Sequence, residues 1–304
     1  MRTARVAAQA KINLFLKILE RDDRGYHRLW TMFQRIDLAD DVVVRVGAGE
    51  RSVRTTGPQL PAGGLGPQAQ NLAARAAEEY AAHQRGAFPE DFTIEITKNI
   101  PVGSGMGGGS ADAGAVLRAL DAMAPKPLGA ERLLEVARTL GADVPFLTGD
   151  LERAYGADYG DRVSRATPAP ALPTADVVLV VPKFRINTAE AYRWLDGDRS
   201  REWSATKQVH PERVQLPPST SDWESFCREG NDFEPVVEKR HPVLREIRER
   251  LVAKGAVAAR LTGSGSTVFG LFAGQAPSDA QLGFDATVLR TRTSERVVPV
   301  QRQE

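Results

Sequence analysis

Residues 101–110 read Pro-Val-Gly-Ser-Gly-Met-Gly-Gly-Gly-Ser, and five of these ten positions lack a side chain. Glycine lets the backbone approach a ligand closely and adopt positive φ angles. The alternating residues 92–97 predict a strand before this loop, and apolar residues at helical spacing after Ser110 predict a helix behind it. A helix start offers unpaired N–H groups and the positive end of a dipole, so we expect the loop to bind a polyphosphate. A flexible surface loop is the less favoured alternative, because linkers are not normally placed between a strand and a capped helix.

Three familiar phosphate-binding loops do not match this stretch. Gly103, Gly105 and Gly108 have the dinucleotide-binding spacing, but that fold needs a second hydrophobic strand ending in an acid, and residues 125–127 read Pro-Lys-Pro instead. A Walker loop needs a lysine directly before the serine, and Ser110 has none. The His-Arg-Asp and Asp-Phe-Gly motifs of protein kinases are absent from the sequence. A different kind of nucleotide-binding loop remains.

The N-terminal segment predicts a half-buried strand, because residues 5–18 alternate between an apolar and a mixed face. Lys11 taken alone is most simply a solvent-exposed strand residue. Asn13 lies two residues further on the same face, and a lysine beside an amide favours a functional pair.

The remaining pattern contains both predicted strands and predicted helices. We expect strands near 42–44, 53, 92–97, 177–181, 256–261 and 268–272, and helices at 72–82, after 110, and at 130–140, 188–195 and 242–254. Asn71 is the expected N-cap of the first of these helices. The proline-rich residues 167–173 predict a linker between two domains, and the tail after Ser294 is expected to be loose.

Composition limits the class of protein. The chain has 304 residues, 42% hydrophobic and 26% charged, and its formal net charge is +1, so it lacks the basic field of a nucleic-acid-binding or membrane-surface protein. A single cysteine, Cys227, excludes an intrachain disulfide and zinc sites built on paired cysteines, and the four histidines lack metal-ligand spacing. Neither a membrane-length apolar run nor a signal-peptide core is found, so we expect a cytoplasmic protein.

Two glycine motifs together resemble a known family. Residues 101–110 are similar to the second motif of the GHMP small-molecule kinases, and residues 262–266, Thr-Gly-Ser-Gly-Ser, are similar to their third motif. The resemblance implies an ATP-dependent kinase that acts on an alcohol group. It also implies an α+β fold of two domains, an N-terminal ribosomal-protein-S5-like domain at 1–166 and a C-terminal ferredoxin-like α/β domain at 167–304.

Further motifs narrow the resemblance to one branch of that family. These are Ala-Lys-Ile-Asn-Leu-Phe-Leu at 10–16, Gly-Tyr-His at 25–27, Gly-Ala-Asp-Val-Pro-Phe at 141–146 and Asn-Asp-Phe-Glu at 231–234. The branch phosphorylates the 2-hydroxyl of 4-diphosphocytidyl-2-C-methyl-D-erythritol in the non-mevalonate route to isoprenoid precursors. The resemblance runs from about residue 5 to residue 273.

The resemblance implies roles for individual residues. Lys11 and Asp143 match the catalytic pair, although without it Asp143 is more simply a turn aspartate that accepts backbone N–H groups. Residues expected near ATP are Asn71, Lys98, Pro101, Val102, Gly103, Ser104, Gly105, Met106, Gly107, Gly108, Gly109, Ser110 and Ala111. A plain solvent-exposed lysine is the alternative for Lys98. Mg²⁺ is expected with ATP, and the Ser110 hydroxyl is its candidate ligand.

Other residues are expected to hold the cytidyl substrate. They are Asn13 at the methylerythritol end, Tyr26 and His27 at the cytosine, Thr188 at the diphosphate, Tyr192 on the second face of the cytosine, and Gly263 and Ser264 in the third motif. Phe184 is the alternative to Tyr192, and packing in a core is the alternative for both rings. No nucleic acid or membrane partner is expected.

Other readings stay open on the sequence alone. The chain could be a GHMP kinase with another acceptor, a related decarboxylase, or a non-catalytic RNA-binding module of S5-like fold, although the near-neutral charge argues against the last. Residues 148–161, which include Tyr159-Gly160-Asp161, depart from the pattern of the family, and residues 196–224 form a longer segment than usual.

Overall fold

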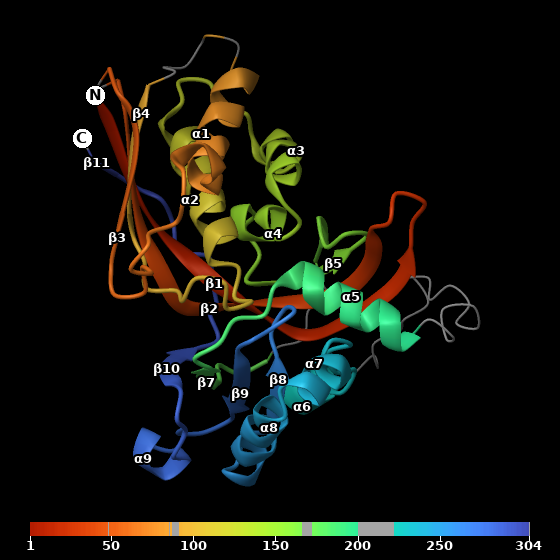
Figure 1. Cartoon of the computed structure of the whole chain (residues 1–304). Helices are drawn as coiled ribbons and strands as arrows, with labels where there is room; N and C mark the ends of the chain where they lie inside the picture. The colour runs from red at the N-terminus through yellow and green to blue at the C-terminus, as the bar shows by residue number, and fades with distance from the viewer. Residues whose placement is uncertain (48, 85, 87–90, 166–171, 200–221, 304) are drawn as a thin grey trace.

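The computed structural model describes residues 1–47, 49–84, 86, 91–165, 172–199 and 222–303. These residues form two β-sheets that are each partly covered by helices, with the first sheet in the upper part of the molecule and the second sheet in the lower part (Figure 1). The α+β prediction is therefore confirmed. Residues 167–171 of the expected linker and most of the 196–224 segment lie outside the described ranges, and the division into domains at residue 166 stays a prediction.

The first sheet is built on two long strands, β1 (Arg2–Arg21) and β2 (His27–Val46), which pair antiparallel along most of their length. The other strands of this sheet are β3 (Arg51–Thr56), β4 (Phe92–Thr97), β5 (Arg153–Ala157), β6 (Arg162–Ser164) and β11 (Gln301–Gln303). The spatial order is β11-β1-β2-β4-β3, and β5 pairs with both β2 and β6. A tight turn at residues 22–26 joins β1 to β2.

Four helices cover one face of the first sheet (Figure 1). They are α1 (Leu72–His83), α2 (Gly108–Met123), α3 (Ala130–Leu140) and the short α4 (Val144–Thr148), and a 3₁₀ turn η1 (Gln68–Gln70) precedes α1. Asn71 caps α1 as expected, because its side chain accepts the N–H of Ala73 at 2.9 Å. The buried faces of these helices and of the sheet form one apolar core.

The second sheet is antiparallel throughout, with the order β10-β7-β9-β8. Its strands are β7 (Asp176–Val181), β8 (Ala258–Leu261), β9 (Val268–Phe272) and β10 (Thr287–Arg292). Its helices are α5 (Thr188–Arg199), α6 (Trp223–Cys227), α7 (Glu234–Arg240), α8 (Val243–Ala253) and α9 (Asp279–Leu282). Leu16 and Ile18 from the end of β1 belong to its apolar core, so the first strand ties the two halves together.

Two expectations from the sequence are wrong. The central part of β1 is buried on both faces rather than one, and the Lys11 side chain is only 3% exposed, because Gly105, Gly107 and the Asn13 amide lie against it. The tail after Ser294 is not loose. Ser294 is buried and bonds to Arg35 through its backbone N–H, and β11 extends the first sheet by pairing with β1.

Candidate active site

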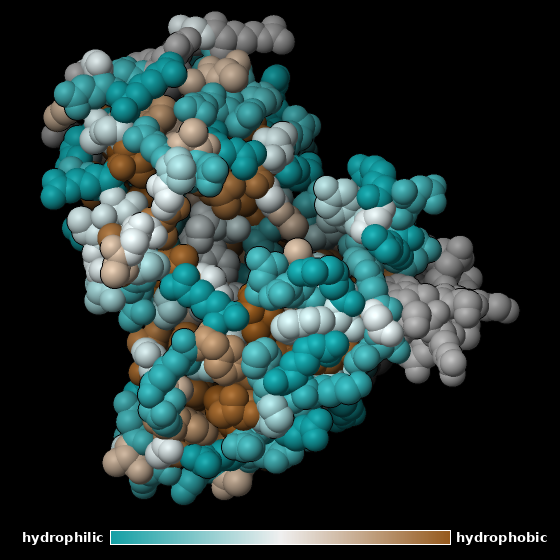
Figure 2. All heavy atoms as spheres, viewed as in Figure 1, coloured by the Kyte–Doolittle hydropathy of each residue, from teal (hydrophilic) through white to brown (hydrophobic). Residues whose placement is uncertain are grey.

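A cavity of about 680 Å³ lies between the first sheet and α5. Figure 2 shows the surface hollowed between the upper helices and the lower half of the molecule. Many of the residues singled out from the sequence line this cavity, although they come from distant parts of the chain. They are Lys11, Asn13, Tyr26, His27, Gly105, Gly107, Ser110, Asp143, Thr188, Tyr192, Gly263 and Ser264.

A buried ammonium and a half-buried carboxylate meet in this cavity. Lys11 Nζ lies 3.3 Å from Asp143 Oδ2, and the Asp143 side chain is 30% exposed. Lys11 Nζ also donates to Asn13 Oδ1 at 2.8 Å and to the Gly105 carbonyl at 3.0 Å. Asp143 precedes α4 but makes no side-chain capping bond to it. Its carboxylate therefore faces the cavity and Lys11 instead of serving as a helix cap.

Asn13 joins three elements through one side chain. Its Oδ1 accepts from Lys11 Nζ, from the Gly263 N–H at 2.9 Å and from Thr262 Oγ1 at 3.3 Å, and its Nδ2 donates to Thr31 Oγ1 at 2.8 Å. The buried amide thus holds the third glycine motif against β1 and fixes the direction of the Lys11 ammonium. The sequence places Asn13 beside Lys11 and assigns it to the substrate, but it does not predict the contacts of Asn13 with Gly263, Thr262 and Thr31.

The two glycine motifs touch at Gly105. This residue has φ +81°, and a Cβ atom there would lie 2.3 Å from the Thr262 carbonyl oxygen. Only glycine fits such an approach in this conformation. Asn231 supports the contact from the other side by donating to the Leu261 and Gly263 carbonyls, both at 2.8 Å. The third motif is therefore a packed support for the loop at residues 101–110.

The loop delivers a helix N-terminus to the cavity. Gly107, with φ +73°, precedes the first turn of α2, and Ser110 of that turn lines the cavity. The N–H groups of a first helical turn have no partner within the helix and carry the positive end of its dipole. Ser104 Oγ in the same loop is buried and has no hydrogen-bond partner among the described residues. Both features suit an anionic ligand with several oxygens.

Lys98 lies under the loop in a buried ionic cluster. Its side chain is 2% exposed, and its ammonium contacts the carboxylates of Asp40 and Asp112, the latter at 2.6 Å. The solvent-exposed alternative for Lys98 is therefore wrong. Burial raises the pKa of Asp112 to about 8, against the opposing effect of the Lys98 charge. For Lys98 itself burial lowers the pKa, but Asp112 and Asp40 outweigh it and leave the pKa above its ordinary value.

Asp40 links the same cluster to the start of the loop. Its Oδ1 accepts the N–H groups of Asn99, at 2.6 Å, and of Ile100, at 2.8 Å. Neither Asp40 nor Asp112 is singled out from the sequence, because no motif marks them. Only the pairing of β2 with β4 brings Asp40 next to Lys98.

Aromatic side chains gather at the end of the cavity near α5. The His27 ring stacks on the Tyr192 ring, with centroids 4.7 Å apart and planes 17° apart, and His27 Nε2 lies 2.6 Å from Asp196 Oδ1. Burial, followed by the charges of Asp143 and Asp196, raises the pKa of Tyr192 to about 12, so its phenol stays neutral. One face of Tyr192 is thus covered by His27, and this stacking is not anticipated from the sequence.

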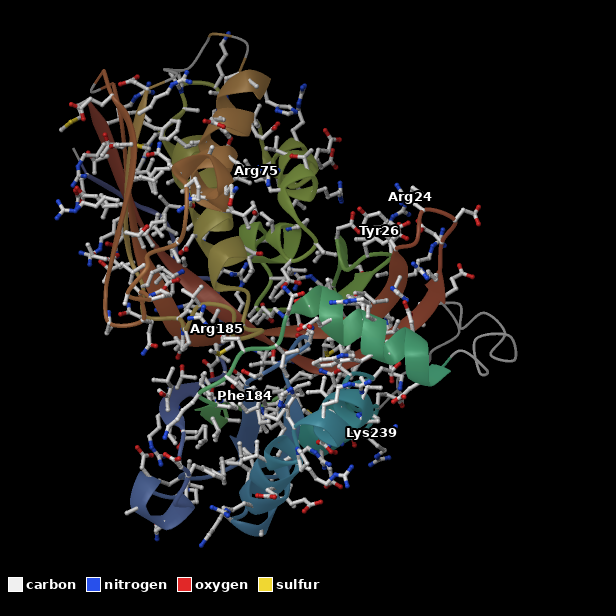
Figure 3. All side chains as sticks on the ribbon, viewed as in Figure 1. Arg24, Tyr26, Arg75, Phe184, Arg185 and Lys239 are labelled. Carbon is white, nitrogen blue, oxygen red and sulfur yellow. The ribbon has the colours of Figure 1, made fainter. Side chains whose placement is uncertain are left out.

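Tyr26 and Phe184 lie in different places. Tyr26 is 64% exposed and projects with Arg24 at the tip of the β1–β2 hairpin, whereas Phe184 lies away from it toward the second sheet (Figure 3). Phe184 stacks on His241 at 4.5 Å and does not line the cavity. Of the two candidates for the second aromatic face of the base site, the geometry therefore favours Tyr192 over Phe184.

Several residues expected near ATP lie outside the cavity lining. Asn71 is occupied by the cap of α1, and Met106 is fully buried in the first core. The other residues of this group are Lys98, Pro101, Val102, Gly103, Ser104, Gly108, Gly109 and Ala111. Arg185, which the sequence does not single out, has its side chain beside Gly103, where its Cδ would lie 3.3 Å from an added Cβ (Figure 3).

Comparisons with known proteins agree with this geometry. The model of the GHMP kinases N terminal domain matches residues 71–149, and that of the GHMP kinases C terminal matches residues 219–284. The 4-diphosphocytidyl-2-C-methyl-D-erythritol kinase of Solibacter usitatus is 37% identical over 273 residues, covering 89% of this chain and 82% of the relative. The enzyme of the same name from Anaeromyxobacter sp. (strain K) is 40% identical over 271 residues, covering 88% of this chain and 80% of the relative.

This chain belongs to the 4-diphosphocytidyl-2-C-methyl-D-erythritol kinases, within the GHMP kinase family. A solved structure of 4-(cytidine 5'-diphospho)-2C-methyl-D-erythritol kinase has a TM-score of 0.70 and 30% identity, and the match covers 95% of this chain and 99% of that one. The mevalonate kinase of Methanococcus jannaschii, at 14% identity and a TM-score of 0.64, shares the fold. The predictions of a GHMP kinase fold and of an ATP-dependent phosphotransferase are confirmed.

The described residues contain neither a cluster of metal-ligating side chains nor a membrane-length helix. Within the described ranges, this family member holds no group of three or more His, Cys, Asp or Glu side chains arranged to bind a metal ion. None of the helices that the structure describes is long and apolar enough to cross a membrane.

Proposed function

We propose that this kinase uses ATP to phosphorylate the 2-hydroxyl of 4-diphosphocytidyl-2-C-methyl-D-erythritol. The observation that carries the proposal is the contact of Lys11 with Asp143 inside a cavity that has the glycine loop at one end and aromatic rings at the other. The glycine loop suits the triphosphate of ATP, and the aromatic rings suit the cytidine of the acceptor. The reaction belongs to the route that makes isoprenoid precursors without mevalonate, and we place it in the cytoplasm.

The proposed chemistry joins the acceptor hydroxyl oxygen to the γ-phosphorus of ATP and breaks the bond from that phosphorus to the bridging oxygen of ADP. Asp143 orients the hydroxyl and accepts its proton, because its carboxylate reaches into the cavity without a competing capping bond. The Lys11 ammonium, at 3.3 Å from Asp143, provides positive charge beside the oxygen that attacks. Asn13 and the Gly105 carbonyl keep that ammonium aimed at this point.

The glycine loop and α2 would hold the triphosphate. The N–H groups of the first turn of α2 would donate to its anionic oxygens. The exposed guanidinium of Arg185 beside Gly103 adds positive charge to this end. The buried cluster of Lys98 supports the loop from below rather than from the cavity.

Mg²⁺ fits this site as an ion carried by ATP. It prefers oxygen ligands and keeps several waters, so one protein hydroxyl next to the phosphates is enough, and Ser110 would supply it. When bound, Mg²⁺ would neutralise charge on the β- and γ-phosphates. The residues of this chain then serve to align the two substrates.

The cytidine end would lie beside Tyr26, His27 and Tyr192. The rings offer flat apolar surface and polar edges, which suit a nucleobase. Arg21 and Arg193 also line the cavity, and their guanidinium groups would supply positive charge for the diphosphate of the acceptor. Thr188 Oγ1 and Ser264 Oγ, 2.9 Å apart, would contact the same diphosphate.

The decisive test is a kinase assay with ATP and three kinds of acceptor. We expect phosphorylation of the cytidyl substrate, little or none of the truncated methylerythritol phosphate that lacks cytidine, and none of mevalonate or homoserine. Equal turnover of the truncated and complete acceptors would contradict the role of the aromatic end. Turnover of mevalonate or homoserine in place of the cytidyl compound would overturn the proposed substrate.

A further inference from the structure

Tyr159 lies in the turn between β5 and β6, within the segment that departs from the pattern of the family, and it lines the cavity. Its hydroxyl donates to Asp22 Oδ2 at 2.6 Å and accepts from Arg24 Nη2, also at 2.6 Å. One phenol therefore joins the β5–β6 turn to the turn at residues 22–26 that carries Tyr26.

Asp22 passes this contact on to Tyr26 through the backbone. Its Oδ1 accepts the N–H of Arg24 at 3.0 Å and the N–H of Tyr26 at 2.8 Å, and its own N–H donates to the Tyr26 carbonyl at 2.8 Å. The hydrogen bond from Tyr159, together with those from the Tyr26 N–H and Arg24, keeps the pKa of Asp22 well below its ordinary value, although partial burial opposes this. The carboxylate that organises the turn is therefore charged throughout the neutral range.

The rings at this site are arranged around one cation. Tyr159 meets Tyr26 edge to face, with centroids 6.2 Å apart and planes at 77°. The Arg24 guanidinium lies 5.7 Å from the centre of the Tyr26 ring and 5.4 Å from that of Tyr159. Tyr26 is largely exposed, so packing in a core cannot fix its ring, and these contacts supply the restraint that packing does not.

The residue before Tyr159 fixes the position of the β5–β6 turn. Asp158 has φ +62°, a conformation that residues other than glycine adopt rarely, although aspartate tolerates it better than most. Its carbonyl accepts the Leu29 N–H at 2.6 Å, and its carboxylate pairs with Arg28 at 3.5 Å and Arg162 at 3.2 Å. These bonds fasten the turn to β2 immediately before Tyr159, and residues held in such conformations gather at functional sites.

From these contacts we infer that Tyr159 is a positioning residue for nucleoside recognition, which holds the 22–26 turn and the Tyr26 ring in place for the cytidine of the acceptor. The inference rests on the proposed function for the identity of the nucleoside. The transfer of the phosphoryl group is served by Lys11 and Asp143, which Tyr159 does not contact. Loss of the Tyr159 hydroxyl should therefore affect acceptor binding and leave the chemical step unchanged.

The test compares Tyr159→Phe with Tyr155→Phe in the full-length chain. Tyr155 lies four positions earlier, its ring stacks on Trp30 at 5.6 Å, and it does not line the cavity, so it is a matched control. The first measurement is kcat and both KM values with ATP and the cytidyl substrate. The second is amide hydrogen exchange at residues 22–26 of each protein without substrate.

For Tyr159→Phe we expect the acceptor KM to rise about fivefold, the effect expected from the net contribution of one typical hydrogen bond, with kcat and the ATP KM unchanged. Exchange at Arg24 and Tyr26 should become several-fold faster, and Tyr155→Phe should match the wild type in both measurements. An unchanged acceptor KM overturns the inference, whatever the exchange shows. A raised KM without faster exchange also contradicts it, because Tyr159 would then act without the turn.

The two proposals can fail separately. If the wild-type protein does not phosphorylate the cytidyl substrate, the proposed function is wrong. Exchange at residues 22–26 then still decides whether Tyr159 holds the turn. If the wild type is active and Tyr159→Phe has the same acceptor KM and the same exchange, only the role of Tyr159 is wrong.

Discussion

The ammonium of Lys11 lies 3.3 Å from the carboxylate of Asp143, and the two residues reach this contact from separate elements, β1 and the start of α4. Lys11 is almost completely buried, whereas Asp143 is open to the cavity. A buried cation next to an accessible carboxylate can stabilise the negative charge that develops on an acceptor oxygen as the carboxylate takes its proton. The predictions below depend on this arrangement and on the elements that hold it.

Replacing Lys11 with a residue of similar length should impair catalysis. For Lys11→Met we expect kcat to fall about 100-fold to 1,000-fold, the loss typical when one group that stabilises developing charge is removed. Steady-state kinetics with the cytidyl substrate provide the measurement. Lys17→Met is the matched control, because Lys17 lies on the same strand but pairs with Asp232 and does not line the cavity. Equal losses in the two variants would contradict the role of Lys11.

The contact between the two glycine motifs should not tolerate a methyl group. Gly105→Ala would place a Cβ 2.3 Å from the Thr262 carbonyl at a positive φ, and we expect a loss of about 3 kcal/mol in the free energy of unfolding. Chemical denaturation measures this loss. Gly109→Ala is the comparison, because the nearest atom to its added Cβ is a Leu72 methyl at 3.9 Å and a helical alanine is favourable. Similar stability of the two variants would show that the motifs do not pack as described.

The buried cluster under the loop should make stability depend on pH. The pKa of Asp112 rises from 3.8 in the unfolded chain to about 8 in the folded protein, so the folded state binds an extra proton between these values. Protonation of Asp112 therefore contributes its full amount to the free energy of unfolding below about pH 4, and this contribution is lost as the pH rises toward about 8. Denaturation across this range should show a flatter profile for Asp112→Asn than for the wild type. Parallel profiles would rule out the titration of Asp112 in this window.

Tyr192 rather than Phe184 should determine affinity for the acceptor. In Tyr192→Leu the stacking partner of His27 is lost, and we expect the acceptor KM to rise about tenfold while the ATP KM stays constant. Phe184→Leu, which alters a ring outside the cavity, should leave the acceptor KM unchanged. The opposite pattern in these two variants would assign the base site to Phe184.

Local patterns predict much of this structure. Alternation predicts β1 and β4, Asn71 caps α1, and the loop at residues 101–110 stands between a strand and a helix as expected. These features depend on neighbours in the sequence, which is why they can be deduced. The glycine motifs and the Lys11 and Asp143 segments also identify the family, because their spacing reflects a shared ligand.

Contacts between distant segments are what the sequence cannot supply. The burial of Lys11 follows from Gly105 and Gly107, which lie against its side chain although they are distant from it in the sequence. The stacking of His27 on Tyr192 depends on the position of α5, and the partners of Lys98 depend on strand pairing. The order of the tail is also non-local, because β11 gains its hydrogen bonds from β1.

The most direct test of the central claim is the turnover of Asp143→Asn, measured against Asp150→Asn as a control. Asp150 is an exposed aspartate in the same segment and lies outside the cavity. The account predicts that Asp143→Asn lowers kcat by about 100-fold to 10,000-fold, the usual worth of a positioned general base, while ATP binding and the melting temperature stay close to the wild type. Near-normal turnover in Asp143→Asn would contradict it.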